Sequence, residues 1–588
     1  MKTNNMKHKH ALLSFEYSNS KDKITPFTFQ DPYKVIIAQT VEEVLPSLKL
    51  IQEAVDSGYY AAGFLSYESA PAFDSAYRVS EGGTMPLLWF GIFSEPALQP
   101  LTSTGEFKVT EWKPSVSRDE YNQSIRTIKQ LIENGDTYQT NYTIRLTSQF
   151  EGDEVSFFNR LKKAQASNYC AYINTGDHSI LSASPELFFH LEGDQITTRP
   201  MKGTTKRGKS FAEDSENAKE LYHSEKNRSE NVMIVDLLRN DLGMIAEPST
   251  VTVEKLFEIE QYPTVHQMTS TITAKVSEHT QLVDIFKALF PCGSITGAPK
   301  ISTMNIITDL ETAPREVYCG AIGYITPNME AIFNVPIRTV VLEHKSGDVV
   351  YGVGGGITWD STTEGEYHEI LTKAKLLEEE PVKFQLLESL LLENGCYFLL
   401  DEHLTRLENS AQYFDFQLND VKRALHEFSG ENSIGVYKVR LLAAKDGDMT
   451  IESQPITLQE TTLKVVLAEE PIDKDNPFLY HKTTNREIYT KFQKRKPEDV
   501  FDVLLWNEDG ELTEFTNGNV VVEMDGYLWT PPVCSGLLAG TFRERLINTG
   551  GIHEKIISVS DLEDCTRIWF INSVRKWKEV QVIKKANR

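Results

Sequence analysis

The feature that most constrains this chain is a break at Glu378–Pro381. A helical pattern runs from Glu366 through Leu377 and then meets the sequence Glu-Glu-Glu-Pro. Proline disfavours helix continuation and restricts the residue before it, and an apolar pattern restarts over Phe384–Leu391. Because 588 residues exceed what one hydrophobic core usually organises, we expect two parts, residues 1–380 and 381–588.

Strand-like and helical patterns occur in both parts. Short apolar runs that end at Gly, Asp or Asn, such as Tyr59–Ser66, are separated in the first part by long helical patterns, such as Arg118–Asn134. Strand candidates in the second part include Val436–Ala443, Leu463–Ala468 and Val520–Met524. Runs of both kinds predict a mixed α/β (α+β) architecture with large sheets in a two-part chain.

The charge and the apolar runs exclude several classes of protein. The formal net charge of −24 argues against nucleic acid and anionic membranes as partners, and an anionic ligand would need cationic side chains gathered locally. No apolar run approaches the roughly 18–20 residues that span a bilayer, and Met1–Leu13 has no apolar signal-peptide core. The six Cys have no CxxC spacing and indicate reduced cytosolic thiols. The sequence therefore predicts a cytoplasmic protein.

A carboxylate and a lysine are spaced so that they can meet in the first part. Glu186, in the segment Ser184–Phe188, precedes Lys202, in the segment Arg199–Thr204, by sixteen positions. A strand, a turn and a second strand of that length can fold back and bring the two side chains together. The alternative is a surface hairpin with a solvated lysine, and these residues alone leave it open.

Three acidic residues are candidates for a metal site. Glu230 opens an apolar helical stretch, and Gly243 suits the C-terminal cap of that helix. Glu366, Glu369 and Lys373 are three and four residues apart, so a helix places them on one face. A helix-dipole contact or an exposed ion pair explains each one alone. As a set they offer the carboxylates that Mg²⁺ binds beside waters or substrate oxygens.

Two glycine-rich segments suit an anion. Cys292–Lys300 and Tyr351–Ile357 hold small residues that let the backbone approach a ligand closely. Arg338 adds a fork-shaped donor that matches a carboxylate. Each signal is weak alone, so the interpretation depends on the order of the motifs along the chain.

In this order the motifs resemble the chorismate-utilising enzyme family, whose fold contains large antiparallel sheets. The similarity runs from about Tyr59–Glu68, through Gly135–Asn141, to Lys375. It is closest to the branch of aminodeoxychorismate synthase component I, because anthranilate synthases carry Ala at the position of Lys202. Met201 stands where that branch usually has Ile.

The resemblance implies a role for each motif. Lys202 would be the covalent nucleophile that adds to C2 of chorismate, and Glu186 would be the general acid that protonates the departing C4 hydroxyl. His266 matches a catalytic-site histidine of the family, although its flanking residues differ from the commoner pattern. The implied magnesium ligands are Glu230, Glu369 and Glu366. The implied substrate-binding residues are Ser294, Thr296, Tyr324, Arg338, Gly354, Gly355 and Lys373.

Chorismate and ammonia are the expected substrates of the first part, with ammonia entering at C4 as Lys202 departs. No segment resembles a glutaminase, since there is no cysteine nucleophile elbow followed by a His-x-Glu partner. We therefore expect the ammonia to come from solution or from a separate glutamine amidotransferase subunit.

The second part contains ordered motifs of a different kind. Arg406 lies early in a helical pattern, where a phosphate would meet both its charge and the helix N–H groups. Lys482, Glu514 and Gly540 follow in that order. The alternatives for the single motifs are an ordinary surface arginine and a surface lysine in a threonine-rich turn.

As a set, these motifs resemble the fold-type-IV pyridoxal-phosphate enzymes over about residues 385–580. That class holds aminodeoxychorismate lyase, branched-chain aminotransferase and D-amino-acid aminotransferase. The resemblance implies that Lys482 carries pyridoxal 5′-phosphate covalently and that Glu514 pairs with the pyridinium nitrogen. The other implied cofactor-binding residues are Arg406, Asn519, Gly540 and Thr541. A homodimer through this part is a further expectation.

Two departures from the class bear on the activity. The usual N-terminal strand and its glycine turn are missing before Phe384, and the substrate-side segments around Arg440 and Asn572–Arg575 do not separate a lyase from an aminotransferase. Context favours the lyase, because the first part would make 4-amino-4-deoxychorismate and the lyase consumes it. The expected function is therefore two-step synthesis of 4-aminobenzoate for folate. The alternatives are an anthranilate-type synthase with an aminotransferase, and a C-terminal module that only docks an amidotransferase.

Overall fold

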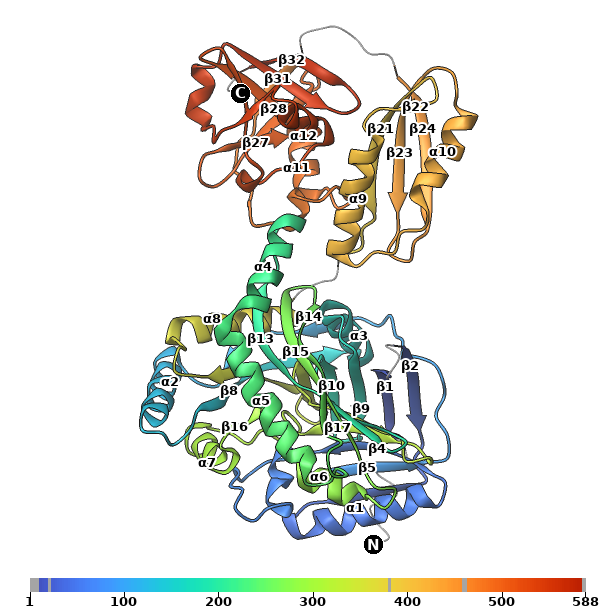
Figure 1. The fold of residues 1–588 in the computed structure, drawn as a ribbon, viewed down its shortest axis with the longest axis vertical. Helices are drawn as coiled ribbons and strands as arrows, with labels where there is room; N and C mark the ends of the chain where they lie inside the picture. The colour runs from blue at the N-terminus through green and yellow to red at the C-terminus, as the bar shows by residue number, and fades with distance from the viewer. Residues whose placement is uncertain (1–9, 20–22, 379–381, 457–462, 584–588) are drawn as a thin grey trace. The chain divides into compact units, whose positions relative to one another are not determined.

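The computed structural model describes residues 10–19, 23–378, 382–456 and 463–583, and the chain divides into two compact units (Figure 1). Unit 1 comprises residues 1–206 and 218–381, and unit 2 comprises residues 207–217 and 382–588. Residues 1–9 of the predicted polar start and residues 379–381 of the predicted boundary lie outside the described residues. The single boundary near residue 381 stays a prediction, and the compact division adds residues 207–217 to the second unit.

Unit 1 contains two large sheets, each with ten strands in the described residues, and the strand pairings in both are antiparallel. The first sheet runs β16 (Gly297–Ala298), β8 (Gln139–Gly152), β20 (Asp348–Ile357), β19 (Thr339–Glu343), β10 (His178–Ser184), β9 (Tyr169–Asn174), β1 (Leu12–Ser18) and β2 (Ile24–Gln30), with β6 (Phe107–Val109) and β7 (Lys113–Pro114) also paired to β8. The second runs β13 (Met201–Lys206), β15 (Val265–Lys275), β12 (Gln195–Arg199), β11 (Leu187–Glu192), β18 (Ala331–Asn334), β17 (Ala321–Ile325), β4 (Tyr60–Leu65), β5 (Leu88–Phe93) and β3 (Lys34–Ala38), with β14 (Thr252–Gln261) paired to β15.

The two sheets pack face to face, and helices cover their outer faces. One apolar cluster joins Phe15 and Tyr17 of the first sheet to Phe64, Trp89 and Tyr324 of the second. A second cluster packs helices α1 (Val41–Asp56), α5 (Glu225–Gly243) and α6 (Leu282–Leu289) on the second sheet, and a third packs α2 (Arg118–Glu133), α3 (Glu154–Gln165) and α8 (Thr363–Ala374) on the first. Helix α7 (Lys300–Leu310) contacts β8 and β16. Helix α4 (Phe211–His223) is divided between the units, because its residues up to Asn217 belong to unit 2 and those from Ala218 belong to unit 1.

Helix α2 shows how the sequence specifies these elements. Ser117 accepts a hydrogen bond from the backbone N–H of Glu120, and the Glu120 carboxylate accepts one from the Ser117 backbone, which forms a capping box. Tyr121, Ile125 and Ile128 recur at helical spacing and are fully buried. The predicted helix Arg118–Asn134 therefore forms with one apolar face against the first sheet.

Unit 2 contains a small antiparallel sheet and a larger mixed one. The small sheet runs β22 (Cys396–Tyr397), β21 (Leu386–Glu393), β23 (Val436–Ala443) and β24 (Met449–Pro455). The larger sheet runs β27 (Leu512–Phe515), β26 (Asp502–Trp506), β25 (Leu463–Leu467), β32 (Lys576–Val582), β31 (Arg567–Asn572), β28 (Gly518–Met524), β29 (Tyr527–Thr530) and β30 (His553–Glu554). The longer helices are α9 (Leu400–Phe414), α10 (Val421–Glu431), α11 (Glu487–Arg495) and α12 (Thr541–Asn548).

The start of unit 2 corrects one expectation. The strand and glycine turn are present, but they follow Phe384 as β21 and Asn394–Gly395, and Gly395 has a φ of +79°. The turn leads through β22 into α9, whose Leu407 and Ala411 pack on Leu390 of β21. The strand and turn of the class are expected to be missing before Phe384, and unit 2 has a strand and a glycine turn directly after that residue.

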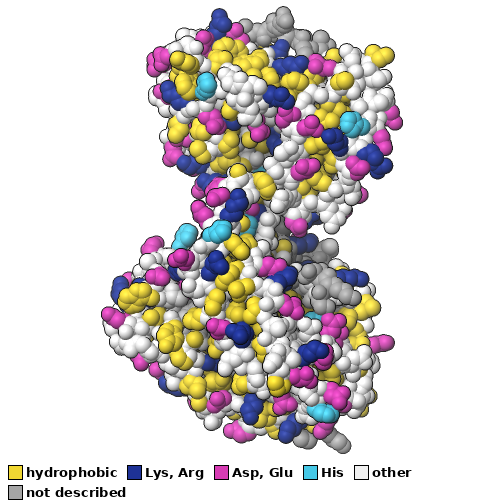
Figure 2. All heavy atoms as spheres, viewed as in Figure 1, with side chains coloured by type: hydrophobic (Ala, Val, Ile, Leu, Met, Phe, Trp, Pro, Cys, Tyr) yellow, Lys and Arg dark blue, Asp and Glu magenta, His cyan; other side chains and the backbone are white. Residues whose placement is uncertain are grey.

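The architecture confirms the predicted fold class of mixed α/β units with large antiparallel sheets. Figure 2 shows acidic and basic side chains interspersed over the visible face. In the described parts of the chain, no helix combines the length and the apolar character that crossing a membrane requires.

Candidate active sites

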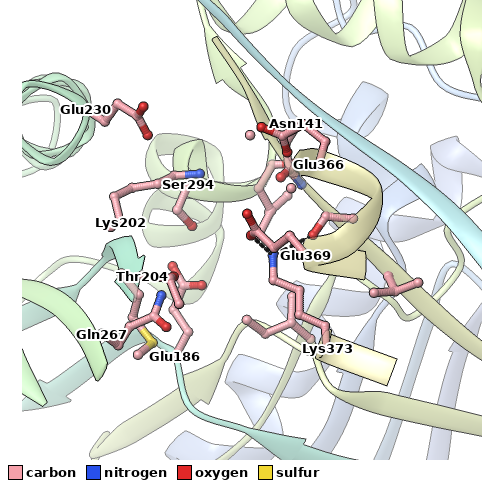
Figure 3. Close-up of a pocket in the computed structure, with 18 of the residues that line it drawn as sticks. Asn141, Glu186, Lys202, Thr204, Glu230, Gln267, Ser294, Glu366, Glu369 and Lys373 are labelled. Atoms are coloured by element: carbon pink, nitrogen blue, oxygen red, sulfur yellow. Dashed lines mark hydrogen bonds and ion pairs between the residues drawn. The ribbon is translucent and has the colours of Figure 1, made fainter. Parts of the chain in front are cut away.

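Unit 1 contains a cavity of about 330 Å³ whose walls come from both large sheets and from two helices. Lys202 of β13 projects into it, with Glu230 of α5 on one side and Glu366 and Glu369 of α8 on the other (Figure 3). Ten of the residues predicted from the sequence line this cavity: Glu186, Lys202, Glu230, Ser294, Arg338, Gly354, Gly355, Glu366, Glu369 and Lys373.

Lys202 is turned into the cavity by an irregularity in β13. The register between β13 and β15 shifts between Met201 and Thr204, as in a β-bulge that re-aims a side chain. Gly203 has a φ of +98°, and a Cβ there would lie 3.1 Å from the Cβ of Asn227, so this position requires glycine. Burial lowers the pKa of Lys202, while Glu186 and Glu230 oppose that shift. A larger share of neutral amine makes this lysine a better nucleophile.

Glu186 lies between β10 and β11 and is 3% exposed. Burial raises its pKa to about 7, against a lowering by the Ser294 hydroxyl and the Lys202 charge. Within the described residues, its Oε1 atom has no hydrogen-bond partner. A carboxyl group that is half protonated near neutral pH, with one oxygen available toward a cavity, can donate a proton to a ligand.

The carboxylates of α8 converge over the glycine-rich strand β20. A Cβ at Gly355 would lie 3.2 Å from Oε2 of Glu366 and 3.5 Å from Oε1 of Glu369, so glycine leaves a space between the two acids. Lys373 Nζ lies 2.5 Å from Oε1 of Glu369 and donates to the carbonyl of Gly354 at 2.7 Å. The Lys373 charge lowers the pKa of Glu369, whereas burial raises the pKa of Glu366.

Glu230 faces this pair from α5. Its Oε1 accepts a 3.4 Å hydrogen bond from Thr358, and burial raises its pKa. In the described residues, no three His, Cys, Asp or Glu side chains are grouped closely enough to hold a metal ion by themselves. A hard cation here would therefore need oxygens from a substrate or from water in addition to these carboxylates.

Arg338 lines the same cavity in a strained backbone conformation. Its φ is +53°, a region that non-glycine residues rarely adopt and that recurs at functional sites. Its Nη1 donates to the carbonyl of Lys373 at 2.9 Å. The guanidinium is therefore fixed by the C-terminal turn of α8.

Three predicted residues do not line the cavity. Tyr324, on β17, lies in the core between the sheets, where its ring centroid is 5.0 Å from that of Phe27 and 5.5 Å from that of Phe15. Thr296 is fully buried, and its hydroxyl donates to the carbonyls of Cys292 and Gly293. Neither residue lines this cavity, and their substrate-binding roles stay predictions.

His266 is the third. It lies on β15 opposite Thr205 and Gln261, and its neighbour Gln267 lines the cavity instead. Successive side chains of a strand point to opposite faces, so only one of the two can face the cavity. His266 therefore does not line this cavity, and its catalytic role stays a prediction.

The cavity also contains residues that the sequence did not predict. Tyr318, Gln139, Gln267 and Lys226 all line it. Tyr318 lies six residues before Tyr324, in the turn segment that precedes β17. Because that segment is not a strand, strand alternation in the sequence could not indicate that Tyr318 rather than Tyr324 lines the cavity. The alternation of β15 around His266 was the one available signal for Gln267.

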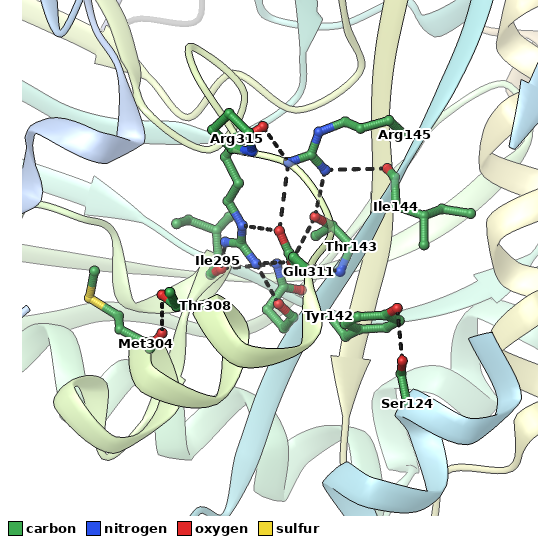
Figure 4. A network of polar contacts seen from close by, with 12 residues as sticks. Ser124, Tyr142, Thr143, Ile144, Arg145, Ile295, Met304, Thr308, Glu311 and Arg315 are labelled. Atoms are coloured by element: carbon green, nitrogen blue, oxygen red, sulfur yellow. Dashed lines mark hydrogen bonds and ion pairs between the residues drawn. The ribbon is translucent and has the colours of Figure 1, made fainter. Parts of the chain in front are cut away.

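A buried polar network that includes Arg145, Glu311 and Arg315 adjoins the wall of this cavity (Figure 4). Arg315 donates to Glu311 at 2.7 Å and to the carbonyls of Asn141 and Ile295 at 2.7 and 2.8 Å. Asn141 and Ile295 both line the cavity, and the guanidinium carbon of Arg145 lies 5.3 Å from the ring centroid of Tyr318. The network therefore holds the backbone of two wall segments, at Asn141 and Ile295.

The second candidate site lies in unit 2 around Lys482. The Lys482 carbonyl accepts a 2.9 Å hydrogen bond from Leu387 N, which ties the segment to β21. Burial lowers the pKa of Lys482 to about 7, and the charges of Arg406 and Arg486 lower it further. A lysine with this pKa is largely neutral just above pH 7 and can bond to a carbonyl carbon.

Glu514 lies within electrostatic reach of Lys482 and is 3% exposed. Tyr489 donates to its Oε1 at 2.7 Å and Asn519 to its Oε2 at 3.3 Å. Burial raises the pKa of Glu514 to about 7. Asn519 also donates to the Leu538 carbonyl at 2.8 Å, which joins the acid to the segment before α12.

Arg406 and the N-terminus of α12 adjoin each other. Arg406 donates to the carbonyl of Ala539 at 3.2 Å, and Gly540 is the N-cap of α12. Glu388 pairs with Arg406 at 2.6 Å and with His403 at 2.6 Å, two contacts that the sequence did not predict. A helix N-terminus with an adjacent arginine can bind a phosphate.

The fold and both sites define a member of a known enzyme family. Residues 13–379 match the model of the chorismate binding enzymes, and residues 385–583 match that of the class IV amino-transferases. The chain belongs to the chorismate-binding enzymes.

Two curated relatives are named aminodeoxychorismate synthase component 1. The protein from Salmonella typhimurium is 38% identical over 319 residues, which cover 54% of this chain and 66% of the relative. The protein from Escherichia coli is 40% identical over 278 residues, which cover 47% and 60%. The chain thus spans less than two thirds of the length of these relatives. The solved anthranilate synthase component I from Streptococcus pneumoniae TIGR4 has a TM-score of 0.51 and 26% identity, and the match covers 63% of this chain and 92% of that protein.

These comparisons confirm the predicted resemblance to the chorismate-utilising enzymes and to the class of pyridoxal-phosphate enzymes that includes the class IV amino-transferases. The roles of the single site residues, the metal, the partner subunit and the location in the cell stay predictions.

Proposed function

We propose that unit 1 converts chorismate and ammonia into 4-amino-4-deoxychorismate and that unit 2 converts this product into 4-aminobenzoate and pyruvate. The observation that carries the proposal is the pair formed by Lys202 and Glu186. A lysine with a lowered pKa and a carboxyl group with a pKa of about 7 share one cavity. The names of the similar synthases support chorismate as the substrate.

The first reaction uses Lys202 as nucleophile and Glu186 as acid. The Lys202 amine adds to C2 of chorismate while the C4–O bond breaks, and Glu186 transfers its proton to the leaving hydroxyl, which departs as water. Ammonia then bonds to C4, the bond between C2 and Lys202 breaks, and the ring double bonds return to their places. The sum of the two displacements is chorismate and ammonia giving 4-amino-4-deoxychorismate and water.

Magnesium fits the carboxylates of this cavity when substrate oxygens complete its ligands. Glu230, Glu366 and Glu369 would hold it, and the space over Gly355 between the last two acids is the observation that favours it. Bound there, Mg²⁺ would polarise a substrate carboxylate. Arg338 and Lys373 supply the positive charge that an anionic substrate needs in a chain with a net charge of −24.

We further propose that a separate glutamine amidotransferase supplies the ammonia. The designation of both relatives as component 1 supports a second component. The chain works in the cytoplasm under this proposal, where chorismate and free ammonia meet.

Pyridoxal 5′-phosphate fits the second site. Lys482 would hold it covalently, Glu514 would face its ring nitrogen, and Arg406 with the N-terminus of α12 would bind its phosphate. Bound there, the cofactor supplies an electron sink next to the substrate amine. Glu514 can hold a proton at neutral pH because burial raises its pKa to about 7.

The lyase reaction needs one base at this site. Lys482 takes the proton from C4 of 4-amino-4-deoxychorismate, the C3–O bond breaks, and the ring becomes aromatic as the enolate of pyruvate leaves. The proton held by Lys482 then returns to the leaving enolate, which gives pyruvate. Aromatisation makes the step strongly favourable, so orientation of the substrate is the main requirement. An aminotransferase would instead need a second, amino-accepting substrate, and the product of unit 1 makes that unnecessary.

Purified protein tests both steps in one vessel. Chorismate, ammonium, Mg²⁺ and pyridoxal phosphate should give 4-aminobenzoate and equimolar pyruvate. Lys482→Ala should accumulate 4-amino-4-deoxychorismate, and Lys202→Ala should leave chorismate unaminated. Formation of anthranilate would overturn the first assignment, and unchanged pyruvate release by Lys482→Ala would overturn the second.

A further inference from the structure

Residues 207–217 belong to unit 2, although they follow directly on β13. The segment closes on itself through a buried ion pair. Arg207 donates to both carboxylate oxygens of Asp214, at 2.7 and 2.8 Å, and Gly208 N donates to the same carboxylate at 2.8 Å. The two side chains are 7% and 5% exposed, and a Cβ at Gly208 would lie 2.1 Å from Asp214 N.

This closed segment is bound to the end of α9. Arg207 donates to the Tyr413 carbonyl at 2.8 Å, and the Tyr413 hydroxyl donates to the Gly208 carbonyl at 2.8 Å. The Arg207 guanidinium carbon also lies 4.4 Å from the centroid of the Tyr413 ring. Three separate contacts therefore fix Tyr413 against residues 207–208.

Tyr413 in turn contacts the residue before Lys482. Its ring centroid lies 4.2 Å from that of His481, and Ser410 of α9 lies 3.0 Å from His481 Nδ1. His481 is 4% exposed. Burial lowers its pKa to about 4, against a smaller rise from the Lys209 backbone, so this ring is neutral at physiological pH.

We propose that residues 207–214 position Lys482 and keep water from it, acting through Tyr413 and His481. The inference rests on the proposed role of Lys482 in unit 2. Lys482 is held by its carbonyl on β21 and by its neighbour His481 on α9 and the Arg207 segment. Arg207 is thus a positioning residue of the second site, contributed by a stretch of chain that lies within the first sequence match.

The electrostatic surroundings make Lys482 sensitive to this support. Besides burial, Arg406 and Arg486 favour its neutral form, whereas Glu388 and Glu514 favour its charged form. Water that enters beside His481 would stabilise the ammonium. Loss of the segment should therefore shift Lys482 toward the charged state, which cannot bond to a carbonyl carbon.

The test measures Lys482 itself in the full chain without cofactor. Reductive methylation with formaldehyde over a pH series, followed by peptide mapping, gives the pH midpoint at which Lys482 becomes reactive. Arg207→Gln should raise this midpoint by about one pH unit, a tenfold change in the neutral fraction at lower pH. Pyridoxal phosphate should bind about tenfold more weakly, and Arg207→Lys, which keeps the charge and a donor toward Asp214 and the Tyr413 carbonyl, should shift both values by less.

Two control variants separate positioning from general damage. Arg423→Gln breaks an exposed ion pair on α10 of the same unit and should leave both values unchanged. Tyr413→Phe removes only the hydroxyl that reaches Gly208 and should shift both values in the same direction by less, which keeps the test sharp if Arg207→Gln does not fold.

Equal midpoints in Arg207→Gln, Arg423→Gln and the parent protein would overturn the inference, as would a shift in Arg423→Gln as large as that in Arg207→Gln. If the parent protein does not bind pyridoxal phosphate, the proposed function of unit 2 fails, while the methylation midpoint still decides the role of Arg207.

Discussion

Replacing Gly356 by alanine tests whether the position of Lys202 limits the first reaction. A Cβ at residue 356 would lie 2.0 Å from Nε2 of Gln139 and 3.1 Å from Nζ of Lys202. Ordinary van der Waals contact begins near 3.4 Å, so the Gln139 amide must retreat by more than 1 Å and the Lys202 amine by a few tenths. Both groups line the cavity, and the amide has to move within it.

The expected loss follows from this displacement. The Gln139 amide is displaced by more than 1 Å inside the cavity and Lys202 by less. A misplacement of about 1 Å that starts away from the reacting atoms can cost about a hundredfold in rate, so kcat/KM for 4-amino-4-deoxychorismate formation should fall by up to about that factor. The crowding itself should cost about 1–3 kcal/mol of stability. The assay couples chorismate and ammonium to product detection in the Lys482→Ala background, so that the first product accumulates.

A matched variant controls for the change of glycine to alanine. Gly243 ends α5, and a Cβ there would meet no atom within 4 Å, so Gly243→Ala should keep the parent rate. A parent-like kcat/KM in Gly356→Ala, with its fold intact by circular dichroism, would refute the claim that Lys202 needs its present position.

The ionisable groups of both sites and the network behind Tyr318 can be tested separately. Burial raises the pKa of Glu186 to about 7, so the folded chain binds an extra proton between roughly pH 4.5 and 7. The contribution of Glu186 to the free energy of unfolding therefore falls as pH rises through that window, by about 3 kcal/mol in all. Glu186→Gln should abolish amination, and denaturant titrations at pH 5 and pH 8 should show a smaller fall in stability than in the parent protein. Arg315→Met leaves Glu311 buried and should destabilise unit 1 by about 3–5 kcal/mol, measured by urea unfolding, and a loss below about 1 kcal/mol would contradict the account of the network. Removal of divalent cations with a chelator should stop amination and spare the release of pyruvate from added 4-amino-4-deoxychorismate, and Glu366→Gln should raise the Mg²⁺ concentration needed; activity that survives the chelator would remove the metal from the site. Borohydride reduction of the protein with pyridoxal phosphate should label Lys482, and a label on another lysine would end that assignment.

The sequence predicted the fold class and most of the first cavity because motif order carried the information. Lys202, Glu186 and the acids of α8 occupy segments whose spacing survives in the fold. Tyr324 and Thr296 do not line this cavity, because a motif identifies a segment and does not say which side chain of that segment faces the cavity.

Strand alternation explains why His266 does not line the cavity. His266 and Gln267 are adjacent on β15, and register decides which of them reaches the cavity. That register depends on the pairing of His266 with Thr205 of β13 and Gln261 of β14. Thr205 lies far from His266 in the sequence, and both pairings contain register shifts that no local pattern predicts. Glu388 and Tyr489 were missed because an acid in a leucine-rich strand and a tyrosine in an amphipathic helix carry no local signal of the partner they meet.

The path of the chain at residues 206–218 affects how the two units can be taken apart. The covalent chain passes from one unit to the other at 206/207, again at 217/218 and a third time at 381/382. A single protease cut near residue 381 therefore leaves residues 207–217 attached to the first fragment and folded into the second. The nicked protein should elute as one species until the Arg207–Tyr413 contacts are unfolded, and the last third expressed alone should lack a piece of its own interior.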